Sequence, residues 1–316
     1  MDAGQPNSPP SLTLPRRKSG LPDLRTNVPN PGKPGFGGGG NGPATAAAQS
    51  EIFSANRATG RIALTVAARG GVTRRARVHE AGSLRVRFPN GGDALEAVIV
   101  NTGGGMTGGD RFSIEMTVGA GAALVAGTAA AEKIYRSTGP EAEMAVRLDV
   151  QAGARLAWLP QETILFDRAR LKRCIEIDLA EDAALIMTES QVFGRAAMGE
   201  FMTEGHFFDR WRLRRDGRLV FADGTRLDGA IAEKLDQPAV AGGGIALGNV
   251  LIAPAGEQTI AAVRALEGQF LGEAGISAWN GIALARLVAR DGAALRHDLI
   301  AILSALGQAV PRLWLQ

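Results

Sequence analysis

The chain has 316 residues, of which 45% are hydrophobic and 21% charged, and its formal net charge is +3 at pH 7. This composition is ordinary for a soluble globular protein of one or two domains. With a single cysteine, Cys174, no signal-like segment near Met1 and no run of about eighteen apolar residues, the sequence excludes a disulfide framework, a cysteine-cluster metal site and a membrane helix, and it predicts a cytoplasmic protein.

The first fifty residues differ in composition from the rest of the chain. They hold nine of the fifteen prolines and nine glycines. Such a segment has too little apolar surface to offset the entropy of ordering, so residues 1–50 are predicted to be a disordered tail and residues 51–316 a single domain. The tail carries five basic and two acidic residues, a difference that equals the net charge of the whole chain. The pI of 9.4 therefore gives the domain no basic face, and we expect no binding to nucleic acid.

The highest glycine density lies in Ala97–Arg111, which reads AVIVNTGGGMTGGDR. Residues 103–108 match the G-x-G-x-x-G pattern, but a dinucleotide-binding turn must open a helix. The residues after Asp110 alternate between apolar and polar and so predict a strand, and no Lys-Ser or Lys-Thr pair follows, as a phosphate-binding loop requires. We interpret the segment as a tight strand-to-strand connection in which Asp110 is a turn residue. The glycines of this structural motif are Gly103, Gly104, Gly105, Gly108 and Gly109.

Three seven-residue segments repeat at offsets of 32 and 29 residues, namely Val118–Leu124, Val150–Leu156 and Leu179–Leu185. Each has the pattern of a half-buried strand, a short turn and a second strand. A repeat near thirty residues is typical of stacked layers that cover each other's apolar faces. The sequence therefore predicts a mainly β fold of stacked β-hairpin layers. Further hairpins are predicted at Arg85–Ile99 and Trp211–Arg226.

Helices are expected in the last part of the chain, about residues 255–310. Trp279, Ile282 and Leu287 lie at roughly helical spacing. Behind them, apolar residues recur at positions i, i+4, i+7, i+8 and i+11, the pattern of an amphipathic helix. These residues are Leu295, Leu299, Ile302, Leu303 and Leu306. Such a stripe normally packs on the protein's own core, although a partner-binding helix presents the same pattern.

No catalytic arrangement is evident around the three histidines, which are His79, His206 and His297. None of them lies in a metal-binding or Ser/His/Asp pattern, so each is interpreted as a structural residue.

Two carboxylates stand among strongly apolar neighbours, Glu162 and Glu189. A buried, isolated carboxylate costs several kcal/mol unless it is paired, hydrated or bound to a metal. Ion pairing with Arg168, Arg170 or Arg195 would be the structural explanation. A functional role is the alternative.

Five blocks, spaced over about residues 50–316, resemble the signature segments of the urease accessory protein family UreD, also called UreH. They are NTGGGMTGGDRF (Asn101–Phe112), EKIYRS (Glu132–Ser137), WLPQETILFD (Trp158–Asp167), FGRAAMGE (Phe193–Glu200) and PRLW (Pro311–Trp314). Five ordered blocks are a far more specific signal than a single glycine motif.

The resemblance implies a non-catalytic maturation factor with a mainly β fold of stacked layers and a few helices. Members of the family act as a scaffold that joins UreF and the GTPase UreG to apo-urease. They are thought to deliver nickel to the urease active site through an internal, water-filled passage. The expected partners are therefore UreF, UreG and apo-urease subunits, and Ni²⁺ is expected only in transit, with no tightly bound cofactor. The adaptor role also makes the stripe Leu295, Leu299, Ile302 and Leu306 a candidate interface with UreF.

The residues that match the family's polar passage are Asp110 and Glu189, with Lys133 nearby. Glu162 is a further passage candidate because it too is a carboxylate among apolar neighbours. Ni²⁺ binds imidazole and thiolate strongly and isolated carboxylates loosely, so spaced carboxylates suit transit and no tight metal site is predicted.

Two alternatives to nickel transit stay open at this point. One is a purely structural adaptor, in which Glu162 and Glu189 only brace the sheet through arginines. The other is a nucleotide-dependent enzyme built on the glycine run. Two residues also depart from the family pattern, since Glu132 stands where a small residue is expected and Thr225 where an acidic residue often precedes the Arg-Leu pair.

Overall fold

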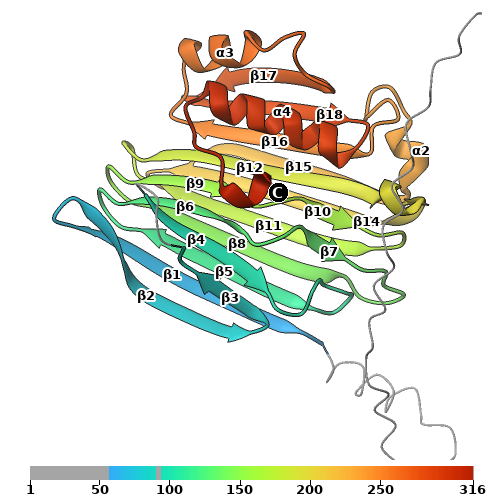
Figure 1. The fold of residues 1–316 in the computed structure, drawn as a ribbon, viewed down its shortest axis with the longest axis horizontal. Coiled ribbons are helices and arrows are strands. Elements are labelled where there is room, and N and C mark those ends of the chain that lie inside the picture. The colour runs from blue at the N-terminus through green and yellow to red at the C-terminus, as the bar shows by residue number, and fades with distance from the viewer. Residues whose placement is uncertain (1–56, 90–93, 316) are drawn as a thin grey trace, which may run out of the picture. The chain divides into compact units, whose positions relative to one another are not determined.

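The structure, a computed structural model, describes residues 57–89 and 94–315 (Figure 1). The predicted disordered tail, residues 1–50, lies outside these ranges. The strands are β1 (Thr59–Arg69), β2 (Val72–Gly82), β3 (Leu84–Arg87), β4 (Leu95–Asn101), β5 (Arg111–Val118), β6 (Ala123–Thr128), β7 (Glu132–Ile134), β8 (Ala142–Val150), β9 (Arg155–Leu159), β10 (Thr163–Leu165), β11 (Arg170–Leu179), β12 (Ala184–Arg195), β13 (Glu200–Phe201), β14 (Glu204–Arg215), β15 (Arg218–Ala230), β16 (Ala246–Ala253), β17 (Glu273–Trp279) and β18 (Ile282–Ala289). The helical segments are η1 (Ala196–Met198), α2 (Ile231–Leu235), α3 (Glu257–Arg264), α4 (Gly292–Ala305) and η2 (Arg312–Leu315).

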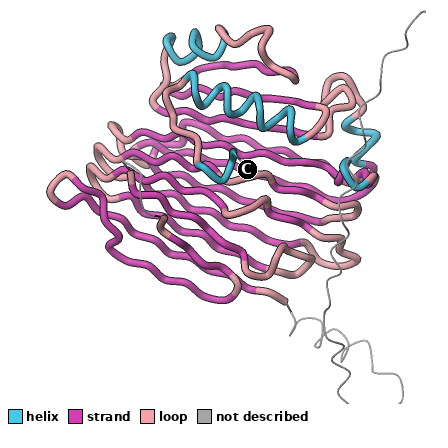
Figure 2. Tube along the Cα trace, viewed as in Figure 1, coloured by secondary structure: helices cyan, strands magenta, loops and turns pink. Residues whose placement is uncertain are grey.

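Strands dominate the described part of the chain (Figure 2), which confirms the predicted mainly β fold. They form two sheets. Sheet A has seven strands in the order β15-β14-β11-β8-β5-β1-β2. Sheet B has eleven strands, with β17-β18-β16-β12-β9-β6-β4-β3 as its main path and the short strands β7, β10 and β13 joined to it through β12. The inner faces of the two sheets pack together and enclose the main hydrophobic core.

The three predicted repeats correspond to β5–β6, β8–β9 and β11–β12, and they stack as expected. Strands β5, β8 and β11 pair in parallel within sheet A, and β6, β9 and β12 pair in parallel within sheet B. Each repeat therefore crosses from one sheet to the other, and its two strands do not pair with each other. The prediction of hairpin layers is wrong on this point, because each strand hydrogen-bonds to its equivalent in the next repeat.

Small residues allow the turns of the repeats to stack closely. Ala122, Ala154 and Ala183 occupy the same position of the repeat, and all three are buried. The carbonyl of Ala122 accepts the N–H of Arg155 over 2.8 Å, and the carbonyl of Ala154 accepts the N–H of Ala184 over 2.9 Å. The backbone of one turn thus bonds directly to the next repeat, so the alignment of the repeats is fixed by main-chain hydrogen bonds.

Both additional hairpins predicted from the sequence are present. Strands β3 and β4 pair antiparallel, as do β14 and β15. The second hairpin turns at Asp216-Gly217, where both residues have positive φ, 47° and 74°. That conformation matches the favoured two-residue hairpin turn. The other Asp-Gly pair, Asp223-Gly224, lies inside β15 and makes no turn.

The prediction of a continuous helical region over residues 255–310 is wrong in its middle part. Helices α3 and α4 are present, but Trp279, Ile282 and Leu287 belong to the antiparallel pair β17–β18, which extends sheet B. The chain reverses at Asn280-Gly281, where both residues have positive φ, 50° and 73°. This turn, rather than the spacing of the apolar residues, determines the local structure.

Helix α4 covers the outer face of sheet B over β16 and β18 (Figure 1). Its residues Leu295, Leu299 and Ile302 are at most 1% exposed, and Leu306 packs partly buried against the same cluster. The stripe therefore packs on the chain's own core, and its role as an interface with UreF stays a prediction. In the described ranges, no helix combines the length and the apolar character that a membrane span requires.

Candidate functional site

Three charged side chains meet in the core between the two sheets. Arg173 of β11 is 2% exposed, and its guanidinium donates from Nε to Oδ1 of Asp209 on β14 over 3.0 Å and from Nη2 to Oδ2 over 2.6 Å. Its Nη1 donates a short hydrogen bond to Oε2 of Glu189 on β12. One cation thus bridges two carboxylates that come from opposite sheets. We call Arg173, Glu189 and Asp209 the charged cluster.

Two tryptophans and a threonine complete the surroundings of the charged cluster. Trp158 on β9 donates from Nε1 to Oε1 of Glu189 over 2.8 Å. Trp211 on β14 donates to Oδ2 of Asp209 over 2.9 Å, and the hydroxyl of Thr163 on β10 lies 3.4 Å from the Nη1 of the arginine. Buried ions are tolerated only when their remaining donors and acceptors find such partners. The charged cluster is therefore a polar site, with hydrogen-bond partners for its charged groups, inside an apolar core.

The cluster combines one cationic side chain with two carboxyl groups. Burial raises the pKa of Glu189, and the carboxylate of Asp209 adds to this effect, whereas Arg173 and the Trp158 hydrogen bond oppose it. Burial alone would lower the pKa of Arg173, but the two carboxylates outweigh burial and raise it, so the guanidinium stays charged. A raised pKa favours the protonated form of Glu189, so the cluster gains an excess negative charge only when Glu189 is ionised.

The buried position predicted for Glu189 is confirmed, since this residue is 3% exposed. Its partner, however, is Arg173 and not one of the three arginines suggested by the sequence. Those three, Arg168, Arg170 and Arg195, form ion pairs with carboxylates outside the charged cluster. Glu189 is therefore paired with an arginine, as the structural explanation required, but that arginine is Arg173.

Glu162 is buried as well, but it belongs to a second ion pair. Arg296 of α4 donates from Nε to Oε1 of Glu162 over 2.7 Å and from Nη2 to Oε2 over 2.6 Å. The same arginine lies 3.4 Å from Oε1 of Gln161 and from the main-chain oxygen of Trp314. The hydrogen bonds that Arg296 donates to Glu162 raise the pKa of Arg296. These contacts connect α4 and the C-terminal segment to sheet B, which is a structural role for Glu162.

Asp110 and Lys133 occupy different surroundings again. Asp110 is buried and accepts the backbone N–H groups of Ala58 and Thr107, each over 2.8 Å. It therefore closes the glycine-rich turn, as the structural interpretation predicted. Lys133 is exposed. Asp110, Glu162 and Glu189 each have their own hydrogen-bond partners, and none of these carboxylates is hydrogen-bonded to another.

The glycine-rich segment connects β4 of sheet B to β5 of sheet A, and a strand follows it, as predicted. Gly104 has a φ of +74°, a left-handed conformation that costs other residues about 1–2 kcal/mol. At Gly108 the obstacle is contact, because a Cβ would stand 1.9 Å from Oγ of Ser137 and 2.2 Å from the carbonyl oxygen of Pro140. Bare backbone is thus required for packing.

A row of polar residues extends from the charged cluster along the inner face of sheet B. Gln191 of β12 pairs in register with Thr163 of β10, which pairs in turn with Glu132 of β7. Oε1 of Glu132 accepts the side-chain amide of Asn101 over 2.9 Å. Gln191 is 2% exposed, and its Nε2 has no hydrogen-bond partner among the described residues. No sequence pattern pointed to this row.

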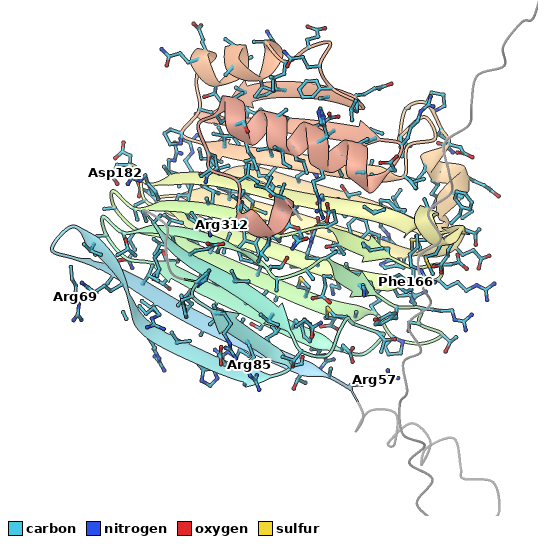
Figure 3. All side chains as sticks on the ribbon, viewed as in Figure 1. Arg57, Arg69, Arg85, Phe166, Asp182 and Arg312 are labelled. Carbon is cyan, nitrogen blue, oxygen red and sulfur yellow. The ribbon has the colours of Figure 1, made fainter. Side chains whose placement is uncertain are left out.

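The histidines do not assemble a metal site. His206 lies between two carboxylates, Glu141 and Asp228, each 3.1 Å from one ring nitrogen. Over residues 57–89 and 94–315, no group of three or more His, Cys, Asp or Glu side chains is arranged to hold a metal ion. A groove of about 660 Å³ lies on the outer face of sheet B, and its lining contains Arg312 but no residue of the charged cluster. Arg312 is labelled in Figure 3.

Comparison with known proteins gives a consistent result over the whole described domain. Residues 58–315 match the family of UreD urease accessory proteins. A urease accessory protein UreD from Rhodopseudomonas palustris strain BisA53 is 56% identical over 272 residues, which cover 86% of this chain and 95% of that protein. A protein of the same name from Bradyrhizobium diazoefficiens is 56% identical over 267 residues, covering 84% and 97%. A third, urease accessory protein UreD 3 from a Bradyrhizobium species, is 54% identical over 275 residues, covering 86% and 98%.

Proposed function

The chain belongs to the UreD family of urease accessory proteins, and on that premise we propose that it is a non-catalytic scaffold that joins UreF and the GTPase UreG to apo-urease. The family match supports a role in urease maturation. The two-sheet body supports a scaffold, because its layers are fixed by main-chain hydrogen bonds and offer broad, rigid faces. We propose a cytoplasmic location, which the single cysteine of the sequence supports.

We propose further that nickel passes through the interior between the sheets on its way to urease. The observation that carries this proposal is the charged cluster, in which two buried carboxylates, Glu189 and Asp209, share one arginine. When Glu189 is ionised, the cluster attracts a divalent cation, and carboxylate oxygens hold Ni²⁺ more loosely than imidazole or thiolate. Such a site slows a cation without trapping it. Nickel is therefore cargo, and no tightly bound cofactor is required.

The contacts of the other passage candidates favour bracing. Glu162 is engaged by Arg296 and Asp110 by two backbone N–H groups. Passage through Glu189 is thus the part of the nickel proposal that the geometry supports best. In a purely structural adaptor, Glu189 would have the same stabilising role as Glu162.

Co-purification tests the scaffold, and nickel analysis separates the scaffold from the passage. The tagged chain is expected to retain UreF, UreG and apo-urease together. A variant that assembles this complex but leaves urease without nickel supports a passage, whereas full metallation after removal of the Glu189 charge supports the pure adaptor. Equilibrium dialysis with labelled nucleotides tests the enzyme alternative, which the strand following the glycine-rich turn disfavours.

A further inference from the structure

The charge of the domain is distributed unevenly. Residues 57–89 contain eight arginines and one glutamate, whereas residues 90–316 contain 22 basic and 28 acidic side chains. The single glutamate, Glu80, is engaged, because its Oε1 accepts from Nη1 of Arg87 over 3.1 Å and from the main-chain N–H of Val86. The total charge, from which we inferred that the domain has no basic face, therefore conceals a basic edge formed by β1, β2 and β3.

Strand β2 is the last strand at one end of sheet A (Figure 1). It pairs antiparallel with β1, and it pairs with no other strand of the described residues. Nine of the eleven residues of Val72–Gly82 are exposed. One side of this strand therefore presents main-chain N–H and C=O groups without a strand partner, and an extended segment can add to such an edge as a further strand.

Two arginines of β2, Arg74 and Arg77, lie on the outer face of sheet A. They pair in register with Ala67 and Thr65 of β1, which alternate with the buried Val66. No carboxylate of the described residues forms an ion pair with either guanidinium. Both positive charges are therefore uncompensated beside the free edge.

A shallow hollow of about 280 Å³ adjoins Arg77 on this outer face. Small side chains leave the space open, and they belong to Ala63, Thr65 and Thr117. The carboxylate in the lining, Glu115, is paired with Arg61 over 3.2 Å. The hollow thus offers an incoming acidic side chain a place beside the unpaired guanidinium of Arg77.

Charged residues on an edge strand also serve to prevent aggregation. That purpose does not depend on the sign of the charge, and β15, the opposite edge of sheet A, carries two basic and two acidic residues. Strand β2 instead carries three arginines and the one glutamate that is already engaged. The predominance of one sign favours a partner of the opposite sign.

The same charges identify the kind of partner. A second copy of β2 would place arginine against arginine, which destabilises a strand pair. The chain's own residues 1–56 carry five basic and three acidic side chains, so their charge does not complement the edge either. Nucleic acid is disfavoured, because β2 has no phenylalanine, tyrosine or tryptophan for bases to stack on, and the guanidinium of Arg75 lies 4.8 Å from the ring centre of nearby Phe88.

We propose that β2 is a docking strand for an acidic, extended segment of a partner protein. The main chain of this segment pairs with the free edge of Val72–Gly82, and its carboxylates bind the guanidinium groups of Arg74 and Arg77. Arginine suits this role because its planar fork holds a carboxylate through two hydrogen bonds. The docking strand goes beyond the proposed scaffold, to which no surface has been assigned, and it does not depend on nickel transit.

Peptide binding to the full-length protein tests the docking strand. The probe alternates glutamate with threonine and valine over the length of β2, and calorimetry at physiological salt measures its affinity. Arg77→Glu is expected to weaken binding about fivefold, and Arg74→Glu combined with Arg77→Glu about twentyfold, since each reversal turns an exposed ion pair into a repulsion.

Arg147→Glu is the matched control and should retain the affinity of the wild type. Arg147 is exposed on the outer face of β8 in the same sheet. It lies three strand spacings from β2, or roughly 14 Å, which exceeds the Debye length of about 8 Å at physiological salt. Circular dichroism checks that all variants are folded.

Two further measurements separate strand addition from simple attraction between charges. The amides of β2 that point away from β1 should exchange with deuterium quickly in the free protein and slowly with the probe bound. A second probe, N-methylated at alternate amides, keeps its charge but cannot pair with the edge, and it should bind at least about tenfold more weakly.

Failure of the acidic probe to bind, or equal binding by the wild type and the double variant, would overturn the proposal. Equal binding of the methylated probe would likewise exclude strand addition. Slow exchange of the outward amides before any probe is added would mean that a second copy or another part of the chain already occupies the edge. Tighter binding of a single-stranded oligonucleotide than of the acidic probe would assign the basic edge to nucleic acid instead.

Discussion

Arg173 and Asp209 are paired in register on the neighbouring parallel strands β11 and β14, and two parallel hydrogen bonds of 3.0 and 2.6 Å join them. The bidentate contact orients the guanidinium so that its remaining Nη1 reaches across to Glu189 on the opposite sheet. Arg173 therefore holds both carboxylates of the charged cluster in position. Its removal should weaken the contact between the two sheets.

Arg173→Met is expected to destabilise the protein by about 3–5 kcal/mol, since it leaves two buried carboxylates without their cation. The loss is measured as the change in the free energy of unfolding in urea. Arg147→Met is the matched control, because Arg147 is exposed on the neighbouring strand β8, and its effect should stay within about 0.5 kcal/mol. Equal stability of the two variants would contradict a central role for Arg173.

Sequence alternation predicted which faces are buried but not which strands pair. A period of two distinguishes the inner from the outer side of a strand, and it is the same whether the partner is the next strand or the equivalent strand of the next repeat. The stacked architecture was predicted from the repeat of Val118–Leu124, Val150–Leu156 and Leu179–Leu185 at offsets of 32 and 29 residues. The crossing between sheets is a tertiary property that this pattern does not contain.

The charged cluster was only half predicted. Glu189 was identified because a carboxylate among apolar residues needs an explanation. Arg173 was missed, although it shares the inward-facing positions of Leu171 and Ile175, because its partners lie 16 and 36 residues away in sequence. Alternation could have indicated that Arg173 is buried, but only the three-dimensional structure brings it to Asp209.

Substitutions in the glycine-rich turn should separate conformation from contact. Gly104→Asn is expected to cost less than about 1 kcal/mol, because asparagine tolerates the left-handed conformation and open space surrounds this position. Gly108→Asn should cost about 3 kcal/mol or more, because the new side chain would collide with Ser137 and the Pro140 carbonyl. Thermal unfolding of both variants measures the difference. The reverse order of stability would show that backbone conformation, not packing, requires these glycines.

Leu299→Asp should prevent folding, because it places an unpaired charge in the buried face of α4. Circular dichroism and soluble yield report this outcome. Ala293→Asp, at an exposed position of the first turn of the same helix, should leave the fold intact. A folded Leu299→Asp protein that no longer co-purifies with UreF would instead support the partner-surface hypothesis for the stripe.

Glu132 should make stability decrease as pH rises. Its pKa is raised from 4.5 to about 7 in the folded protein, so the folded state holds a proton that the unfolded chain has already released between these values. The stabilisation is complete below about pH 4.5 and is lost as pH passes about 7, amounting to at most about 3 kcal/mol. Urea unfolding at pH 5 and pH 7.5 should show this loss in the wild type relative to Glu132→Gln. Parallel pH profiles would mean that the Glu132 carboxyl titrates normally.

Glu189→Gln tests whether the charged cluster carries nickel or only braces the core. The substitution keeps the volume of the side chain and its ability to accept from Trp158, but it removes one of the two carboxylate charges that face Arg173. The cluster then lacks the Glu189 carboxylate, whose charge would attract a divalent cation. We expect the protein to fold and to co-purify with UreF, UreG and urease, while the nickel content of the urease falls. Glu162→Gln, which weakens the brace to Arg296, serves as the comparison and should leave nickel content unchanged. Full metallation of urease by an assembled Glu189→Gln complex would assign Glu189 to bracing and leave the protein as an adaptor.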